Sequence, residues 1–452
     1  MNADRLPLRL LLGWGVGTLG TATLLNALGT VQLFFFVNVL GISGTVAGSI
    51  LFASKIYNLL TDTPMGIISD RTRGRWGRRI PWMVSGAVLC GSAFWLIFNP
   101  PAFTAGNIAA WELVFLLMYS SGYSLFNIPY IALAGEISES ATERARLMSF
   151  RVGFMQVGVV FGAAGALLLV SFGGGERAGY GFMGAIVAWV VAVPMLIAAW
   201  ASWDVDQRGA ERDRLAAGMP NFSTPLVRQQ LLGVLRNRPF MTLMLIKTMQ
   251  IVATAVVSAS ILFFMKGVLG VMEKDVALKF GIPTTLGTLL FVPVWFRITE
   301  RIGKIRAWFA ATVIVILVLL SFLFARPDEP DFIFIARAFV FGVATSGILL
   351  SVQSLLTDTM QYDRDQSGER REGILSGVYS SVEKFAFALG PLLVGVLLDA
   401  GGYSKSAVTQ TPAAERMIYF CVAVLPAIFY LLSLPVLKSF RFDPAQRGIH
   451  GK

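Results

Sequence analysis

The chain has 452 residues, of which 55% are hydrophobic and only 14% are charged. Soluble proteins carry about 25% charged residues, and a single hydrophobic core stops growing at around 250 to 300 residues. The surplus of apolar side chains excludes an ordinary soluble protein and predicts one that faces lipid. The formal net charge of +11 does not indicate a nucleic-acid partner, because the charges lie in short gaps between long apolar runs.

Histidine and cysteine usage argues against several classes of enzyme and metal site. The single histidine, His450, is third from the end of the chain, and the two cysteines, Cys90 and Cys421, lie in apolar segments far apart in sequence. A histidine-based triad, a disulfide framework and a thiolate metal site are therefore not expected. We expect a protein that is not an enzyme and that holds no cofactor and no metal.

Twelve apolar runs follow one another along the chain, each long enough to cross a membrane as a helix. Their approximate ranges are 10–37, 44–69, 80–99, 109–134, 149–171, 180–203, 240–266, 276–298, 306–325, 332–360, 371–399 and 414–438. Backbone polar groups cannot stay unpaired in hydrocarbon, and barrel strands have only about ten residues, so each run predicts a helix. The expected fold class is an all-α membrane protein with twelve transmembrane helices.

The basic residues indicate how the chain is oriented. Residues 1–9 lead into an apolar run without a small-residue cleavage site, which predicts a first span rather than a signal peptide. Of the 38 basic residues, 27 lie in or beside the N-terminus, alternate loops and the C-terminal tail, and seven lie in the opposite loops. Because cytoplasmic loops retain Lys and Arg, we expect both termini in the cytoplasm of a multi-pass cell-membrane protein, in a bacterial inner membrane.

The longest hydrophilic stretch divides the chain into two halves of six spans. We expect an N-terminal half over 1–203, a cytoplasmic linker over 204–239, a C-terminal half over 240–440 and a cytoplasmic tail over 441–452. A weak internal repeat supports this division, because GIISDRTRGRWGRR after the second span has the counterpart VWFRITERIGKIR after the eighth. Two six-helix pseudo-repeats with such turns are typical of the major facilitator fold, in which substrate binds near mid-membrane between the halves.

Three polar residues share one face of the second span. Lys55, Asn58 and Asp62 are separated by three, four and seven positions, which places them on the same side of a helix. This face is expected to look into the helix bundle. An ionised carboxylate within a span costs at least about 2.5 kcal/mol, so Asp62 is expected to have a functional role where water, a cation or a basic group meets it. The alternative is a packing carboxylate with a static partner.

The turn after the second span, SDRTRGRWGRRIPW, places Asp70 among five arginines. Charge-assisted hydrogen bonds between a carboxylate and arginines can hold one conformation and release it in another. We therefore predict a gate that involves Asp70, Arg71 and Arg78, to which the stretch LLTDTMQYDRDQSGERREG in the second half adds Asp358 and Arg370. The alternative is that the arginines only retain this loop in the cytoplasm.

A lysine on the eleventh span is the second intramembrane charge of interest. Lys384 lies about twelve residues after Glu372, so its depth is similar to that of Asp62. An ammonium in hydrocarbon is stabilised by a nearby anion, and we hypothesise that Lys384 and Asp62 share one hydrated site. Glu383 points about 100° away from Lys384 around the helix, so it is expected to meet a different helix.

Several other patterns are more simply explained by packing. The GxGxxG pattern at residues 15–20 lies inside a span, without the preceding strand that a dinucleotide loop requires. Gly158 and Gly162 likewise predict a contact face of small residues. Lys247 and Arg337 lie a few turns from span ends, and their side chains are expected to snorkel towards the membrane surface.

Three segments carry a resemblance to a known family. The first is NLLTDTPMG followed by SDRTRGRWGRRIPW, the second is NIPYIALAGEIS followed by ERARLMSFR, and the third is LLTDTMQYDRDQSGERREG followed by SSVEKFAFALGP. They resemble the glycoside-pentoside-hexuronide:cation symporter family, which includes the bacterial melibiose permeases, over residues 10–440. The resemblance implies a major facilitator transporter that couples sugar uptake to sodium, lithium or a proton.

The resemblance also implies where the coupling cation binds. The family uses carboxylates on the second and fourth spans, with a lysine of the eleventh span close by. Asp62 matches one of these carboxylates and Lys384 matches the lysine, whereas Asn58 and Asn127 stand at the positions of two others. A hard cation favours several anionic oxygens, so we expect coupling to a proton, or weak coupling, rather than coupling to sodium.

The expected substrate is a sugar or glycoside, although two recognition residues of the family are replaced. Ala22 stands where relatives have an acidic residue, and Ile131 stands where they have the tryptophan on which galactosides stack. Other groups that can bind a sugar remain, namely an amide that hydrogen-bonds hydroxyls, an arginine kept from the family, tyrosine rings and the lysine. The residues expected to bind substrate are Asn127, Arg151, Tyr130, Tyr379 and Lys384, with Tyr123 as a further ring.

Other substrates and other classes of protein stay open. A hexuronate or an amphiphile such as a lysolipid would also fit, since some distant relatives in this family move lipids while retaining the Asp and Lys pair. A membrane enzyme would need a catalytic set outside the membrane, and a sensor would need a signalling domain. We expect a monomer in the lipid bilayer whose partners are a small molecule and a proton, with no nucleic acid.

Overall fold

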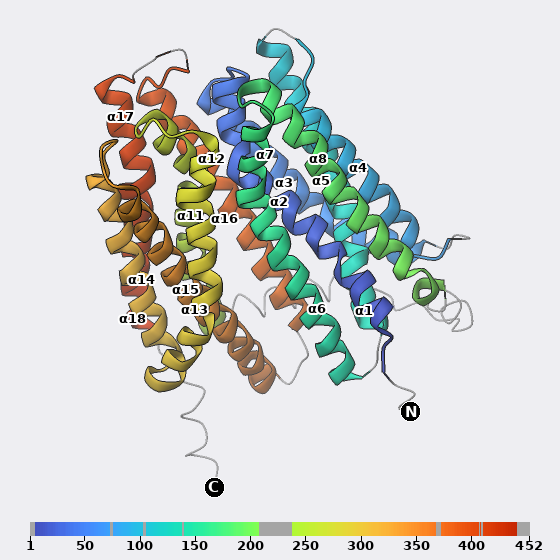
Figure 1. Cartoon of the computed structure of the whole chain (residues 1–452). Helices are drawn as coiled ribbons and strands as arrows, with labels where there is room; N and C mark the ends of the chain where they lie inside the picture. The colour runs from blue at the N-terminus through green and yellow to red at the C-terminus, as the bar shows by residue number, and fades with distance from the viewer. Residues whose placement is uncertain are drawn as a thin grey trace. The chain divides into compact units, whose positions relative to one another are not determined.

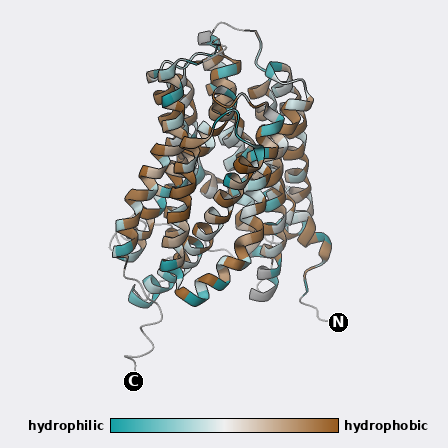
Figure 2. Cartoon of the chain, turned by 60° about the vertical axis from the view of Figure 1, so that its left-hand side comes forward, coloured by the Kyte–Doolittle hydropathy of each residue, from teal (hydrophilic) through white to brown (hydrophobic). Residues whose placement is uncertain are grey.

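The computed structural model describes residues 5–72, 76–102, 105–137, 140–207, 237–367, 372–405, 407 and 410–440. Almost all of these residues are helical (Figure 1), which confirms the prediction of an all-α protein. Hydrophobic residues cover much of the length of the helices (Figure 2). Most of the predicted linker over 204–239 and the whole predicted tail over 441–452 lie outside the described residues.

The chain divides into two compact units. Unit 1 comprises Met1–Met219, Val271–Ala277 and Gly395–Thr409, and unit 2 comprises Pro220–Gly270, Leu278–Val394 and Gln410–Lys452. The predicted halves over 1–203 and 240–440 stay a prediction, because two short segments of the second half group with unit 1.

The helices of unit 1 are α1 (Leu8–Gly15), α2 (Gly17–Phe34), α3 (Gly44–Arg71), α4 (Ile80–Phe98), α5 (Ala105–Ile137), α6 (Ala141–Val160), α7 (Ala166–Phe172), α8 (Glu176–Ala201) and the short α12 (Glu273–Val276). The main helices of unit 2 are α11 (Arg238–Gly267), α13 (Ile282–Ile302), α14 (Lys304–Ser321), α15 (Asp331–Ser367), α16 (Glu372–Ala400), α17 (Pro412–Tyr419) and α18 (Leu425–Ser439), and the last residues of α16 group with unit 1. Short π-helical turns continue several of them, at Phe35–Val39, Phe161–Gly165, Ala277–Gly281 and Phe420–Val424.

Eleven segments among the described residues are long and apolar enough to cross a membrane, and each coincides with one predicted span. The remaining predicted span, 44–69, corresponds to α3, which has 28 residues. Its length suffices for a crossing, since about 20 residues span the hydrocarbon core. Polar side chains such as Lys55, Asn58 and Asp62 lower its hydropathy and set it apart from the other spans.

Small residues set the distances between the helices of unit 1. A Cβ at Gly158 of α6 would lie 2.6 Å from the Leu19 carbonyl oxygen of α2, and one at Gly162 would lie 2.6 Å from that of Thr23. A Cβ at Gly20 would lie 2.6 Å from the Val191 carbonyl oxygen of α8. These contacts confirm that the glycines of both patterns serve close helix packing.

Candidate functional site

The polar face of α3 meets the neighbouring helix α5. Ser124 of α5 donates a hydrogen bond to Asp62 Oδ1 at 2.7 Å. Asn58 is buried, and its Nδ2 donates to Ser124 Oγ at 3.1 Å and to the Ser120 carbonyl at 3.1 Å. Thr61 Oγ1 lies 3.0 Å from the same Ser124 hydroxyl. The structure therefore brings Asn58 and Asp62 together, on a face of α3 that packs against α5.

Lys55 continues this face one turn earlier along α3. Its Nζ lies 5.5 Å from the centroid of the Tyr119 ring of α5, a geometry typical of a cation–π interaction. The lysine and the aspartate thus face the same helix, α5, about seven positions apart along α3. Sequence reasoning missed the two serines of α5, although the spacing of Ser120, Ser124 and Asn127 already places them on one side of a helix.

Prolines lie beside the polar residues on both helices. Pro64 follows Asp62 by two positions in α3, and Pro129 follows Asn127 by two positions in α5. A proline within a helix removes the hydrogen bond to the carbonyl four residues earlier. Each helix therefore carries a carbonyl without its usual helical donor next to the polar residues, which adds acceptor capacity there.

The structure gives the predicted substrate residues of unit 1 different environments. Tyr130 is completely buried, its ring stacks on Trp14 at 4.6 Å between centroids, and its hydroxyl donates to the Trp14 carbonyl at 3.0 Å. Its hydroxyl also lies 2.7 Å from Thr18 Oγ1, so both the ring and the hydroxyl are engaged in packing. Asn127 and Arg151 are partly buried, on α5 and α6.

Unit 2 contains an ion pair between two of its helices. Lys247 Nζ of α11 lies 3.4 Å from Glu383 Oε1 of α16 and 4.9 Å from the centroid of the Tyr379 ring. Gln353 Nε2 of α15 donates to the Tyr379 hydroxyl at 3.5 Å. The expectation that Lys247 snorkels is wrong, because its ammonium is buried against α16, whereas the expectation that Glu383 meets another helix is confirmed.

The predicted partnership of Asp62 and Lys384 stays a prediction. Asp62 belongs to unit 1 and Lys384 to unit 2. Both side chains are partly buried, and each has interactions within the structure. Lys384 follows Glu383 directly on α16, so it occupies a different side of that helix.

The turn after α3 forms a network of charges at one end of unit 1. Arg78 pairs with Glu136 near the end of α5, and Arg79 Nη2 lies 2.6 Å from the same carboxylate. Asp206 accepts hydrogen bonds from the backbone N–H of Arg79, at 2.9 Å, and of Ile80, at 3.2 Å, so it caps the start of α4. Gly77 is required beside it, since its φ is 90° and a Cβ would collide with the Asp206 carboxylate.

The remaining predicted gate residues are partly described. In unit 2, Asp358 Oδ2 of α15 lies 2.6 Å from Lys304 Nζ at the start of α14. The side chains of Asp70 and Arg71, and the whole of Arg370, lie outside the described residues. Glu136, Asp206 and Lys304 are the partners that the structure gives to these charged turns. Glu136 and Lys304 lie in the segments NIPYIALAGEIS and VWFRITERIGKIR, which the sequence patterns already indicated, although neither residue was predicted as a gate residue.

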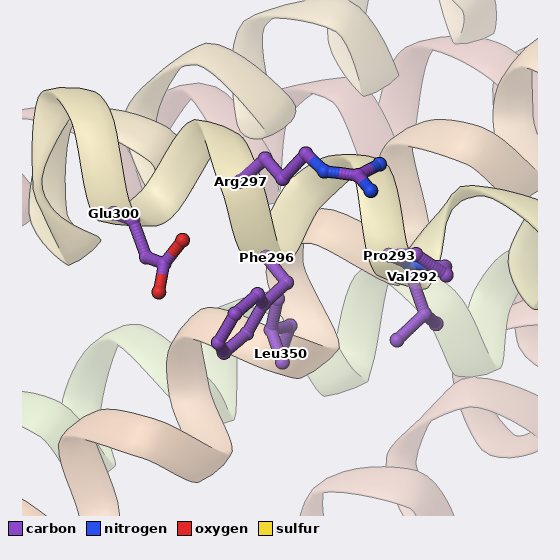
Figure 3. Close-up of a pocket in the computed structure, with 6 residues that line it drawn as sticks. All are labelled: Val292, Pro293, Phe296, Arg297, Glu300 and Leu350. Carbon is purple, nitrogen blue, oxygen red and sulfur yellow. The ribbon is translucent and has the colours of Figure 1, made fainter.

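A groove on unit 2 lies between α13 and α15. Its volume is about 430 Å³, and its lining is Val292, Pro293, Phe296, Arg297, Glu300 and Leu350. Figure 3 shows Phe296 beside Leu350, with Glu300 towards one end of the groove. None of its lining residues is a predicted site residue. Among the described residues, no group of three or more His, Cys, Asp or Glu side chains is placed to hold a metal ion.

Comparisons with known proteins agree with this architecture. The model of the family described as "MFS/sugar transport protein" matches residues 13–443. The inner membrane symporter YicJ of Escherichia coli is 26% identical over 445 residues, which cover 97% of this chain and 93% of that protein. The isoprimeverose transporter of Lactiplantibacillus pentosus is 24% identical over 418 residues, which cover 92% of this chain and 84% of that protein.

A solved structure shares the fold. It is a bacterial homologue of the human lysosomal transporter Spinster in an inward-facing, unoccupied conformation. Its TM-score is 0.71 at 17% sequence identity, and the match covers 97% of this chain and 99% of that one.

Proposed function

Because the chain belongs to the MFS/sugar transport protein family, we propose that it is a secondary active transporter that carries a sugar or glycoside by alternating access in symport with a proton. The relatives that align along most of its length include an inner membrane symporter and an isoprimeverose transporter. The observation that carries the proton assignment is the partly buried carboxylate of Asp62, which accepts a hydrogen bond from Ser124 beside the amide of Asn58.

The chemistry around Asp62 favours a proton over sodium. Asn58, Thr61 and Ser124 contribute neutral amide and hydroxyl groups, and hard cations are held best by several carboxylate or carbonyl oxygens. A single carboxylate can bind and release one proton without such a cage. The hydroxyl of Ser124 can rotate to donate to the ionised carboxylate or to accept from the protonated one, so it can serve both states.

We further propose that α3, which is second in chain order, also spans the membrane and brings the number of spans to twelve. At 1.5 Å per residue, the 28 residues of α3 extend for about 42 Å, which exceeds a hydrocarbon core of about 30 Å.

We also propose that two ion-pair networks act as gates. Arg78 and Arg79 with Glu136 tie the turn before α4 to the end of α5. Lys304 with Asp358 ties the turn before α14 to α15 in the other unit. These similar pairs support the predicted internal repeat.

Uptake into proteoliposomes tests the function. Purified protein should accumulate one or more sugars or glycosides from a panel when the interior is alkaline. Asp62→Asn should abolish this accumulation and retain exchange of labelled for unlabelled sugar, because the asparagine keeps the hydrogen bond to Ser124 but cannot bind a proton. Stimulation by sodium at constant pH would contradict proton coupling. Transport of lysolipids with no transport of sugars would instead support the alternative substrate class.

A further inference from the structure

The ion pair between Lys247 and Glu383 places two opposite charges within the membrane-spanning parts of two helices. Lys247 is the tenth residue of α11 and Glu383 the twelfth of α16, so they lie about 14 and 17 Å from the starts of their helices. Both helices are longer than a hydrocarbon core about 30 Å thick, so these positions lie inside the core, in the half nearer to the helix starts. Charged residues at this depth are rare and are usually functional.

The two members of the pair differ in their exposure. The Lys247 side chain is 9% exposed, whereas that of Glu383 is 48% exposed. A carboxylate that is half exposed at this depth is costly against lipid tails, so its exposed surface must face water or a polar ligand. Lys247 contacts the carboxylate through Oε1, which leaves Oε2 able to accept hydrogen bonds from a ligand.

Lys247 and its neighbours hold the Glu383 side chain in place. Lys247 Nζ lies 3.4 Å from Glu383 Oε1 and 4.9 Å from the centroid of the Tyr379 ring. Lys384 is the other charged group beside Glu383 on α16, and Tyr379 and Gln353 are the polar groups that complete the cluster. These neighbours hold the carboxylate in one orientation.

We propose that Glu383, held and oriented by Lys247, is the hydroxyl-binding residue of the substrate site in unit 2, and that its ligand is a neutral sugar or glycoside with two adjacent hydroxyl groups. This inference rests on the proposed function and narrows its substrate class. A fixed carboxylate accepts hydrogen bonds from two hydroxyls of one ring. It repels the carboxylate of a hexuronate, because Lys247 is already neutralised by the pair.

Sugar binding and coupled uptake by purified protein test this role. Glu383→Gln should raise the KM for the transported sugar about 10- to 100-fold, the range for a lost hydrogen bond to a charged group. It should leave the accumulation ratio at saturating sugar and the pH profile unchanged. An analogue that lacks one of the two hydroxyls should be bound equally by the native protein and by Glu383→Gln. Glucuronides should bind at least tenfold more weakly than the matching neutral glycosides.

Two further variants separate binding from folding. Lys247→Met combined with Glu383→Met removes both charges with similar volume, so its thermal unfolding midpoint should stay close to the native value while sugar affinity is lost. Lys279 and Asp331 form another lysine–carboxylate pair of unit 2, with 2.6 Å between Nζ and Oδ1, at the start of α15. Asp331→Asn should leave the KM unchanged.

Each result supports or overturns the inference. Coupled sugar uptake with an unchanged KM in Glu383→Gln overturns this role alone and leaves the proposed function intact. A shifted pH profile or a lost accumulation ratio at saturating sugar shows that Glu383 takes part in coupling, which also overturns it. Sugar binding without response to a pH gradient overturns proton coupling and leaves this site standing. A native protein that binds none of the sugars overturns both.

Discussion

Glu112 shows how a single buried carboxylate differs from the predicted coupling residue. It lies on α5, its side chain is completely buried, and neither carboxylate oxygen has a hydrogen-bond partner among the described residues. An amide of the same shape therefore removes no hydrogen bond at this position. We predict that Glu112→Gln leaves the thermal unfolding midpoint close to the native value and changes coupled uptake by no more than about twofold.

Asp62→Asn is the matched comparison, because it makes the same replacement of a carboxylate by an amide on the adjacent helix. It should lose accumulation driven by the pH gradient, whereas Glu112→Gln should keep it. Equal loss in both variants would mean that Glu112 also changes its charge during transport, contrary to the role assigned by its surroundings.

The packing of α6 against α2 depends on a glycine at position 158. Gly158 and Gly153 both lie on this helix. A Cβ at Gly158 would be 2.6 Å from the Leu19 carbonyl oxygen, whereas one at Gly153 would have no atom within 4 Å. Gly158→Ala should therefore destabilise the protein by about 1–3 kcal/mol through overpacking, measured as a lower unfolding midpoint in detergent.

Gly153→Ala should have the opposite sign. Alanine is favoured over glycine in a helix by roughly 0.5–1 kcal/mol, and at Gly153 no contact offsets that gain. A midpoint that falls in both variants by the same amount would show that α6 does not rest on α2 through Gly158.

The residues that cap α3 and α4 could not be predicted from the sequence. Within unit 1, Asp399 accepts hydrogen bonds from the backbone N–H of Gly44 and Thr45, at 2.8 and 2.7 Å, and Asp206 caps α4 in the same way. Carboxylates stabilise helix N-termini, but these two come from sequence positions 355 and 127 residues away from the groups they bind. A local pattern identifies the helix and leaves the identity of such a cap undetermined.

Over the whole molecule, features of a continuous stretch could be predicted, whereas contacts between residues far apart in sequence could not. Hydropathy is a property of a continuous stretch, so the spans and the polar face of α3 could be predicted from sequence. The partner of Lys247 is 136 residues away on another helix, and it depends on which sides of α11 and α16 meet. Ser124 was missed for a related reason, since its spacing with Ser120 and Asn127 shows a shared helix side but not that Asp62 lies beside it.

Charge distribution over the whole chain predicts its orientation in the membrane. Alternate loops hold most of the basic residues, which should keep them in the cytoplasm. Asp204 and Asp328 are both exposed and lie in loops of opposite predicted location. We predict that an impermeant maleimide added to intact cells labels Asp328→Cys, and that it labels Asp204→Cys only after the membrane is permeabilised.

The native cysteines make this measurement direct. Cys90 and Cys421 are both completely buried, so the unmodified chain should stay unlabelled under either condition and serves as the control. Because both test variants replace an exposed aspartate, they change the charge of the chain equally and differ only in the side on which the new thiol lies. Labelling of Asp204→Cys in intact cells would place the basic loops outside and would reverse the direction in which a proton gradient drives the proposed transport.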